Sequence, residues 1–359
     1  MTAPEAAIQE RWALRPPRSL RTLERERLRV LFAGVWNRGP GPDFRGAILL
    51  RDDGRILRGD VELHRRPRDW LRHGHAGDQA YSAVILHLVA ALDATAAGQA
   101  RSPDGRGPPR LALLAASPPP AGSWPCSRVV QQAGAAATAA RLQRVACARL
   151  RRKARRAAML LSAASAEQAA YRLLLEALGQ GGNVRPMAAL AQRLPLAALP
   201  FAEGAAAVAA RLQAAAREGT WRSSGLRPAN APVRRLRAAA ELIARLRAQG
   251  DIAVGLAALA ALPQAAALQQ LRLPGLLGPD RARQLLVDVA YPLALALGGD
   301  GDALRRRWLA LGGARYGRTA PLRRRLAAGG LRSWRNGATQ ALLELEAVYC
   351  RQGACCICP

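Results

Sequence analysis

The stretch PDFRGAILLRDDGRILRGDVELH, residues 42–64, decides the fold of the N-terminal part of the chain. Residues 47–51 and 56–64 are apolar enough, and of the right length, to form strands. Asp52-Asp53-Gly54 lies between them, and an acidic residue followed by glycine is typical of a tight β-hairpin turn. We therefore predict two antiparallel strands joined by this turn.

Working outward, three more apolar runs of strand length flank the hairpin, at residues 29–36, 83–92 and 110–115. The segment SPPPAGSWP, residues 117–125, is too rich in proline for regular structure and is the predicted boundary. Beyond it, helix-forming residues with apolar positions at helical spacing occupy residues 131–168, 169–179, 233–249, 281–298 and 337–350. We predict an α/β domain with a mixed sheet over residues 1–120, followed by an α-helical domain over residues 121–359.

Charge and composition restrict the class of protein. The formal net charge is +29, and 50% of the residues are hydrophobic, so the chain is not a disordered polypeptide. Of the 54 basic residues only Lys153 is a lysine, a bias that a GC-rich genome also produces. The charge favours a nucleic-acid partner. The first 17 residues are interrupted by charges and no apolar run has membrane-spanning length, so we expect a soluble, cytoplasmic protein without a membrane partner.

All four histidines, His64, His73, His75 and His87, lie close together in the sequence. Imidazoles supply metal ligands and proton acceptors near neutral pH. Acidic residues share this neighbourhood, namely Asp43, Asp60, Glu62, Asp69 and Asp78. On a strand, Asp60, Glu62 and His64 would point to one face. We therefore predict the site here, with His87 either part of it or a core residue.

Pro42-Asp43 before one strand and Glu62-Leu63-His64 on the next resemble the signature of the PD-(D/E)XK nuclease superfamily. The resemblance implies a restriction-endonuclease-like fold in which Asp43 and Glu62 bind Mg²⁺ or Mn²⁺ and His64 orients the attacking water. His64 stands where those nucleases usually carry lysine, and Lys153 is one candidate for a relocated lysine.

This pattern leaves three functions open. The first is a divergent metal-dependent nuclease acting on DNA or RNA, with Arg149, Arg151, Arg152 and Arg156 as phosphate contacts. The second is a zinc-dependent hydrolase in which His73 and His75 join His64 as ligands. The third is a nucleic-acid-binding protein whose nuclease-like site is inactive.

Cysteines form a second candidate metal site. Cys350, Cys355 and Cys358 have a C-x₄-C-x₂-C spacing that suits an iron–sulfur cluster or Zn²⁺, and Cys126 is the best candidate for a fourth ligand. Some PD-(D/E)XK nucleases join one early cysteine to a C-terminal group through such a cluster. We predict that Cys147, among helical residues, is a small buried side chain.

Most of the chain is similar to a bacterial family called domain of unknown function 2851. The similarity is carried by GPDFRGAILL, GDVELH and DWLRHGHAGDQAYSAVILHLV, and further on by GGNVRPMAALAQRLP, LRPANAPVRRLRAAAELI and YCRQGACCICP. The resemblance implies a site centred on Asp43, Glu62 and His64 but no defined activity. Asn230 is predicted to cap the helix that follows it.

Overall fold

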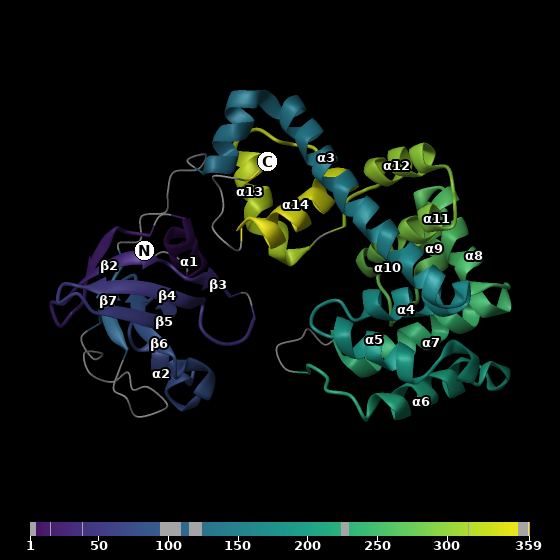
Figure 1. Cartoon of the computed structure of the whole chain (residues 1–359), viewed down its shortest axis with the longest axis horizontal. Coiled ribbons are helices and arrows are strands. Elements are labelled where there is room, and N and C mark those ends of the chain that lie inside the picture. Colours follow the sequence, from purple (N-terminus) through teal and green to yellow (C-terminus); the bar gives the residue numbers. More distant parts are fainter. Residues whose placement is uncertain are drawn as a thin grey trace. The chain divides into compact units, whose positions relative to one another are not determined.

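The computed structural model describes residues 5–14, 16–37, 39–93, 109–114, 124–223, 230–314, 316–350 and 358 (Figure 1). The chain folds into two units. The first consists of Met1–Gly134, Ala320–Leu331 and Leu345–Pro359, and the second of Ala135–Thr319 and Arg332–Glu344. The predicted linker at residues 117–125 falls mostly outside the described residues.

The first unit is built on a mixed sheet, as predicted. Its strands are β1 (Ser19–Arg21), β2 (Arg27–Phe32), β3 (Val35–Trp36), β4 (Phe44–Arg51), β5 (Ile56–His64), β6 (Val84–Val89) and β7 (Arg110–Leu113). They are ordered β1-β2-β4-β5-β6-β7, with β3 paired to β4. Pairing is antiparallel from β1 to β5 and parallel from β5 through β6 to β7.

The predicted hairpin is present between β4 and β5, with Leu50 opposite Ile56. The turn closes because Arg51 N donates to Arg55 O at 2.9 Å and the Asp53 carboxylate accepts from Arg55 N at 3.0 Å. Gly54 has a φ of +81°, a left-handed conformation that glycine adopts at little cost. This turn fixes the register and therefore which side chains of β5 face inward.

The strand predicted over residues 29–36 is in fact two strands, so this prediction was wrong in its extent. β2 ends at Phe32 and β3 begins at Val35. Gly34 between them has a φ of +90°, and the pairing of β2 with β4 also shifts register between Val30 and Phe32. The left-handed glycine redirects the chain, and the apolar pattern alone does not reveal such a break.

The sheet curves until its two edges almost meet. Thr22, just after β1, forms an antiparallel bridge with Ala112 of β7, and Leu23 N donates to Leu111 O at 2.8 Å. The first helix, α1 (Glu5–Leu14), packs Ile8 and Trp12 into the same core as the strand residues. This helix was not predicted, and it brings its polar side chains to the β4–β5 hairpin.

The second unit is mostly helical, as predicted. The helices after the sheet are α3 (Pro125–Ala163), α4 (Ala166–Leu178), α5 (Val184–Arg193), α6 (Ala205–Ala216), α7 (Pro232–Ala248), α8 (Ile252–Ala258), α9 (Gln264–Leu271), α10 (Pro279–Leu285), α11 (Tyr291–Ala296), α12 (Gly301–Ala310), α13 (Ala320–Ala328) and α14 (Asn336–Val348). Of these, α13 belongs to the first unit. No helix in the described part of the chain combines the length and apolarity needed to cross a membrane.

Two predicted helical segments differ in detail. The predicted segment 131–168 spans two helices, since α3 ends at Ala163 and α4 begins at Ala166. Ser165 accepts from Gln168 N and caps the start of α4. The segment 281–298 is interrupted by a π-helical turn, Leu286–Ala290, between α10 and α11. Such turns are rare and are often found at functional positions.

Candidate metal centre

A short loop places Asp43 at the start of β4. The Asn37 side chain holds this loop, because its Oδ1 accepts from Gly39 N at 3.0 Å and its Nδ2 donates to Pro42 O at 2.9 Å. Asn37 N also donates to Asp43 O at 2.7 Å. Gly41 has a φ of +92°, which allows the tight path between the two prolines. The Asp43 side chain therefore starts from a fixed backbone.

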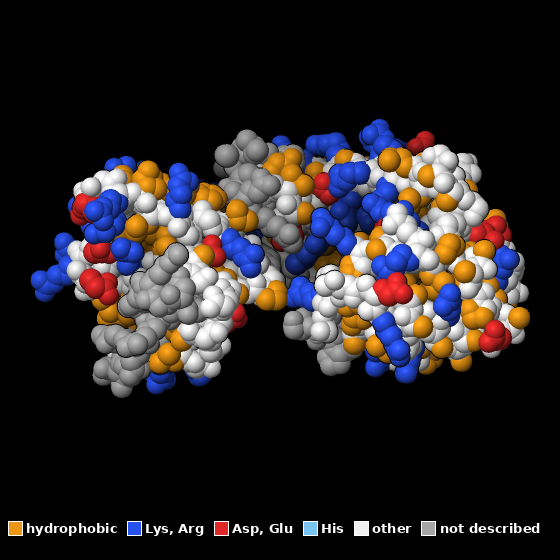
Figure 2. All heavy atoms as spheres, turned by 60° about the horizontal axis from the view of Figure 1, so that its bottom comes forward, with side chains coloured by type: hydrophobic (Ala, Val, Ile, Leu, Met, Phe, Trp, Pro, Cys, Tyr) orange, Lys and Arg blue, Asp and Glu red, His pale blue; other side chains and the backbone are white. Residues whose placement is uncertain are grey.

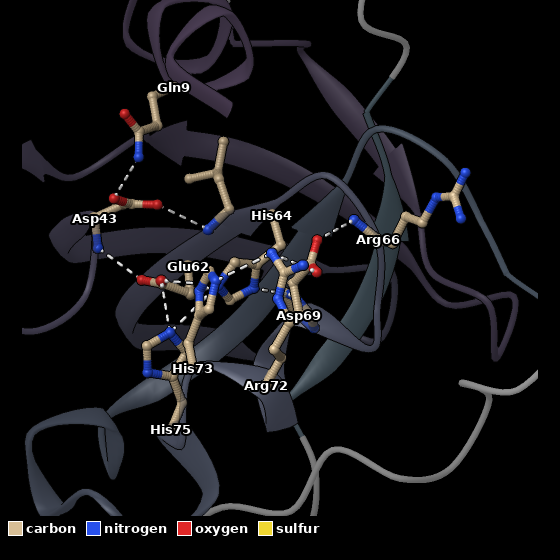
Figure 3. Close-up of polar contacts among 11 residues, drawn as sticks. Gln9, Asp43, Glu62, His64, Arg66, Asp69, Arg72, His73 and His75 are labelled. Atoms are coloured by element: carbon tan, nitrogen blue, oxygen red, sulfur yellow. Dashed lines mark hydrogen bonds and ion pairs between the residues drawn. The ribbon is translucent and has the colours of Figure 1, made fainter. Parts of the chain in front are cut away.

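The structure brings Asp43 and Glu62 together, as the sequence predicted. Glu62 Oε2 accepts from Asp43 N at 2.9 Å, and Asp43 Oδ2 accepts from Leu63 N at 3.0 Å. Gln9 of α1 donates to Asp43 Oδ1 at 2.7 Å, as Figure 3 shows. The two carboxylates are thus tied to each other's strands across the hairpin.

Three imidazoles converge beside Glu62 (Figure 3). His64 Nε2 lies 3.2 Å from His73 Nδ1 and 3.3 Å from His75 Nε2. One ligand nitrogen from each of the three histidines lies within 4.8 Å of the others. Glu62 Oε1 lies 3.4 Å from His64 Nε2 and 3.3 Å from His75 Nε2.

These separations match the donor set of a tetrahedral metal site. Nitrogen ligands about 2.0–2.1 Å from a zinc ion lie roughly 3.3–3.4 Å from one another when the geometry is tetrahedral. Two neutral imidazole nitrogens this close share at most one proton, so their lone pairs oppose each other unless a proton or a cation lies between them. The residues present therefore fit a divalent cation with a preference for nitrogen ligands.

Local backbone geometry explains how His73 and His75 reach His64. The short helix α2 (Asp69–Arg72) follows β5, and Gly74 then adopts a φ of +76° before the 3₁₀ turn η1, His75–Gly77. The left-handed glycine turns the chain back, so that both neighbours of Gly74 face the end of β5. His64 is fully buried and His75 is 7% exposed, whereas His73 is exposed. The cluster therefore opens to the surface at His73.

The fourth histidine orients the first. His64 Nδ1 lies 2.9 Å from His87 Nε2, and both side chains are fully buried. Trp70 contacts His64, His75 and His87 through its ring. For Nε2 of a neutral His64 to carry a lone pair, the ring proton of His64 must be on Nδ1. That N–H then donates a hydrogen bond to His87 Nε2. His87 thus has the position of a second-layer partner that fixes a ligand's tautomer.

The electrostatics of the cluster suit a cation. Burial, followed for Asp43 by the charge of Glu62, raises the pKa of both carboxyls to about 8. Burial, followed by the neighbouring histidines, lowers the pKa of His64 to about 2. Burial likewise lowers the pKa of His87 to about 3. His64 and His87 are therefore neutral near pH 7, with lone pairs available, and burial favours the protonated form of the two carboxyls when no cation lies beside them.

Three other predicted residues have mainly local contacts. The carboxylate of Asp60 accepts from Gly46 N at 2.9 Å, at the point where the pairing of β4 with β5 is irregular. Asp69 accepts from Arg66 N and pairs with Arg72. Asp78 accepts from Ala80 N and caps the turn η2 (Gln79–Tyr81). Their common role is to hold the loops around the site.

Residues of α1 and η2 also contribute to the site, and they were not predicted from the sequence. Gln9 contacts Asp43, and Glu5, one turn earlier, interacts electrostatically with His73 and His75. The ring of Tyr81 stacks on His75 with centroids 3.8 Å apart. The i, i+4 spacing of Glu5 and Gln9 on one helix face is the signal that could have indicated a shared direction.

The other predicted positions lie outside the histidine cluster's contacts. Lys153 pairs with Asp288 in the helical unit at 2.9 Å, which gives this lysine a local partner. Arg149 and Arg152 pair with Glu344, Arg156 pairs with Glu176, and Arg151 is exposed. Among the described residues, Arg151 is therefore the one of these four arginines without an acidic partner.

The predicted cysteine site is described only in part. Cys126 is the second residue of α3 and is half-buried, as is Cys350, while Cys358 is exposed. Cys147 is half-buried and not fully buried as predicted. Cys355 lies outside the described residues.

Comparison with known proteins identifies the family. The sequence model of a family described as "Protein of unknown function (DUF2851)" matches residues 5–214, and the chain belongs to this family. The matched region contains the hairpin and all four histidines. No curated protein and no solved structure matches the chain.

Proposed function

We propose that the first unit is a metal-dependent phosphodiester hydrolase, a divergent nuclease, whose divalent cation is held by His64, His73 and His75. The observation that carries the proposal is the convergence of one nitrogen from each histidine beside Glu62 Oε1. Three protein ligands leave a fourth position for water or substrate, as in catalytic zinc sites.

Each group then has a defined task. A divalent cation at this position would polarise a phosphate oxygen and lower the pKa of water. Glu62, beside His64 and His75, accepts the proton of the attacking water. Asp43 holds the backbone of the strand that carries Glu62, through Leu63 N. The exposed side of the cluster, at His73, is where substrate enters.

The charge around the site favours a polyanionic substrate. Residues 65–72 connect β5 to His73 and contain the arginines Arg65, Arg66, Arg68 and Arg72. Arg72 lies beside His73, whereas the side chain of Arg66 points away from the cluster (Figure 3). Figure 2 shows basic side chains spread over the visible face, with acidic ones fewer. Nucleic acid is the polyanion that such a surface most often binds, with a steep dependence on salt.

The placement of Asp43 before β4 and Glu62 on β5 supports the proposed relation to PD-(D/E)XK nucleases. With His64 at the lysine position, nitrogen ligands replace the purely carboxylate site, which favours Zn²⁺ or Mn²⁺ over Mg²⁺. The second candidate is a Mg²⁺ site on Asp43 and Glu62 alone, favoured by the contact between these residues. The histidine variants below separate the two.

The test combines metal content with cleavage. Purified full-length protein is analysed for bound metal and assayed on single- and double-stranded DNA and RNA with Mg²⁺, Mn²⁺ and Zn²⁺. His73→Ala, at an exposed position, is expected to lose metal and cleavage while staying folded. Glu62→Gln is expected to keep metal and lose cleavage. The matched control is Asp60→Asn, the same kind of charge removal on the same strand, and it should do neither.

Two results would count against the proposal. If His73→Ala cleaves like the wild type with Mg²⁺, the carboxylate site is the active one. If the wild-type protein binds nucleic acid but cleaves none of the substrates with any of the metals, the site is inactive and the chain is a binding protein.

A Cys358→Ser variant, analysed for iron and zinc, assigns any second metal to the cysteines.

A further inference from the structure

The helical unit contains a buried and a half-buried guanidinium group that face the same neutral oxygen. Arg235, in the first turn of α7, is 5% exposed, and its Nη2 donates to Asn230 Oδ1 at 2.5 Å. Arg281 of α10 donates from its own Nη2 to the same oxygen at 3.1 Å. Asn230 was predicted to cap α7, but α7 has no side-chain cap. Its amide oxygen serves the two arginines instead.

Neither arginine has an acidic partner in the described part of the chain. Arg235 Nε is buried and donates to nothing there. The nearest candidate for compensation is Asp288, whose charge lowers the free-energy cost of burying Arg281. Asp288 is already engaged, since Lys153 Nζ lies 2.9 Å from its Oδ1 and Gln180 donates to its Oδ2 at 3.1 Å.

Two like charges of this kind are costly to bury together. Burial, followed by the charges of Arg281 and Arg234, lowers the pKa of Arg235 to about 10. Buried arginines in proteins are normally paired with carboxylates or with bound anions. A neutral amide oxygen satisfies one N–H of each group but none of the charge.

A narrow crevice leads to Arg235 and Asn230. It is lined by these two residues and Pro232, and by the Gly179–Asn183 loop with Met187. Gly181 in this loop has a φ of +110°, and the loop carries no acidic residue. In this structure the crevice has no room for a water molecule. A ligand therefore enters only when the Gly179–Asn183 loop and the start of α7 move apart.

We propose that Arg235 and Arg281 form an anion-binding site that takes a phosphate group, with Asn230 holding the two guanidiniums in position. Two planar guanidiniums present paired N–H donors that match the oxygens of phosphate. The site is separate from the histidine cluster and does not depend on the function proposed for it.

The experiment measures binding of inorganic phosphate to the full-length protein. Equilibrium dialysis with labelled phosphate gives stoichiometry and affinity, and the thermal midpoint is followed in phosphate and in chloride at equal ionic strength. Saturable binding of one phosphate with a raised midpoint is expected. No saturable binding up to about 10 mM phosphate overturns the proposal, because a ligand specific for the folded state must stabilise it.

Asn230→Asp is the decisive variant. It has the same shape but places a carboxylate between the guanidiniums, so it should raise the midpoint without phosphate and weaken phosphate binding by about tenfold or more. Arg281→Met should weaken binding similarly. Arg237→Met is the matched control, since Arg237 is exposed and lies on the same helix as Arg235. Unchanged binding in Asn230→Asp, or equal loss in Arg237→Met, contradicts the assignment.

Discussion

Replacing His87 tests whether the histidine cluster is organised for a metal. His87 Nε2 lies 2.9 Å from His64 Nδ1, and no other polar contact to His64 Nδ1 is present among the described residues. Removing this acceptor leaves His64 free to carry its proton on Nε2, where it would block a metal ligand. The fully buried position means that water cannot readily replace His87.

The size of the effect follows from the role of such partners. Loss of a hydrogen bond to a ligating histidine lowers metal affinity by about 10- to 100-fold, or roughly 1.4–2.7 kcal/mol. His87→Leu removes the acceptor, whereas a glutamine at this position can place its Oε1 near the original Nε2. We therefore expect weak metal binding in His87→Leu and near wild-type binding in His87→Gln.

The assay is competition for Zn²⁺ between the protein and a chromophoric chelator of known affinity. Urea unfolding in excess chelator shows whether each metal-free variant is folded. The reasoning is refuted if both variants bind Zn²⁺ as tightly as the wild type. It is equally refuted if the glutamine and leucine variants lose affinity to the same extent while both remain folded.

Three further predictions concern stability. The raised pKa values of Asp43 and Glu62 mean that the metal-free folded state holds protons that the unfolded chain has lost. Its stability should therefore fall as pH rises from about 7 to 8, a range in which most unfolded histidines are neutral. Urea titrations with chelator should show this slope, and Asp43→Asn with Glu62→Gln should flatten it. Gly59→Ala should cost about 1–3 kcal/mol because its Cβ would lie 2.5 Å from Ala83 O, and an unchanged urea midpoint would contradict this packing. Asp251 caps α8 through two backbone N–H groups, so Asp251→Ala should cost about 1 kcal/mol by thermal unfolding, with Asp251→Asn as the milder control.

The part of the site on the hairpin could be predicted because its geometry is local. The Asp-Asp-Gly turn sets the register, and strand alternation then places Glu62 and His64 on one face. The Pro-Asp motif placed Asp43 before the neighbouring strand, where the structure has it. Each of these inferences needs only the hairpin turn and the alternation of side chains along a strand.

The remainder depends on contacts that a linear pattern does not encode. His73 and His75 reach His64 only because Gly74 is left-handed, and a glycine in a polar loop permits that conformation without requiring it. Gln9 reaches Asp43 from a helix 34 residues away. The contact of Asp60 with Gly46 N was not predicted, because strand alternation does not reveal the irregular pairing of β4 with β5 at Gly46.

The order of the two units along the chain has a consequence for biosynthesis. All residues of the histidine cluster and its carboxylates precede the helical unit, yet the first unit also includes Ala320–Leu331 and Leu345–Pro359. A ribosome therefore releases the histidine cluster early, and the last pieces of the same unit only after most of the helical unit has been made. The first unit is thus expected to complete its folding only when nearly the whole chain has been synthesised.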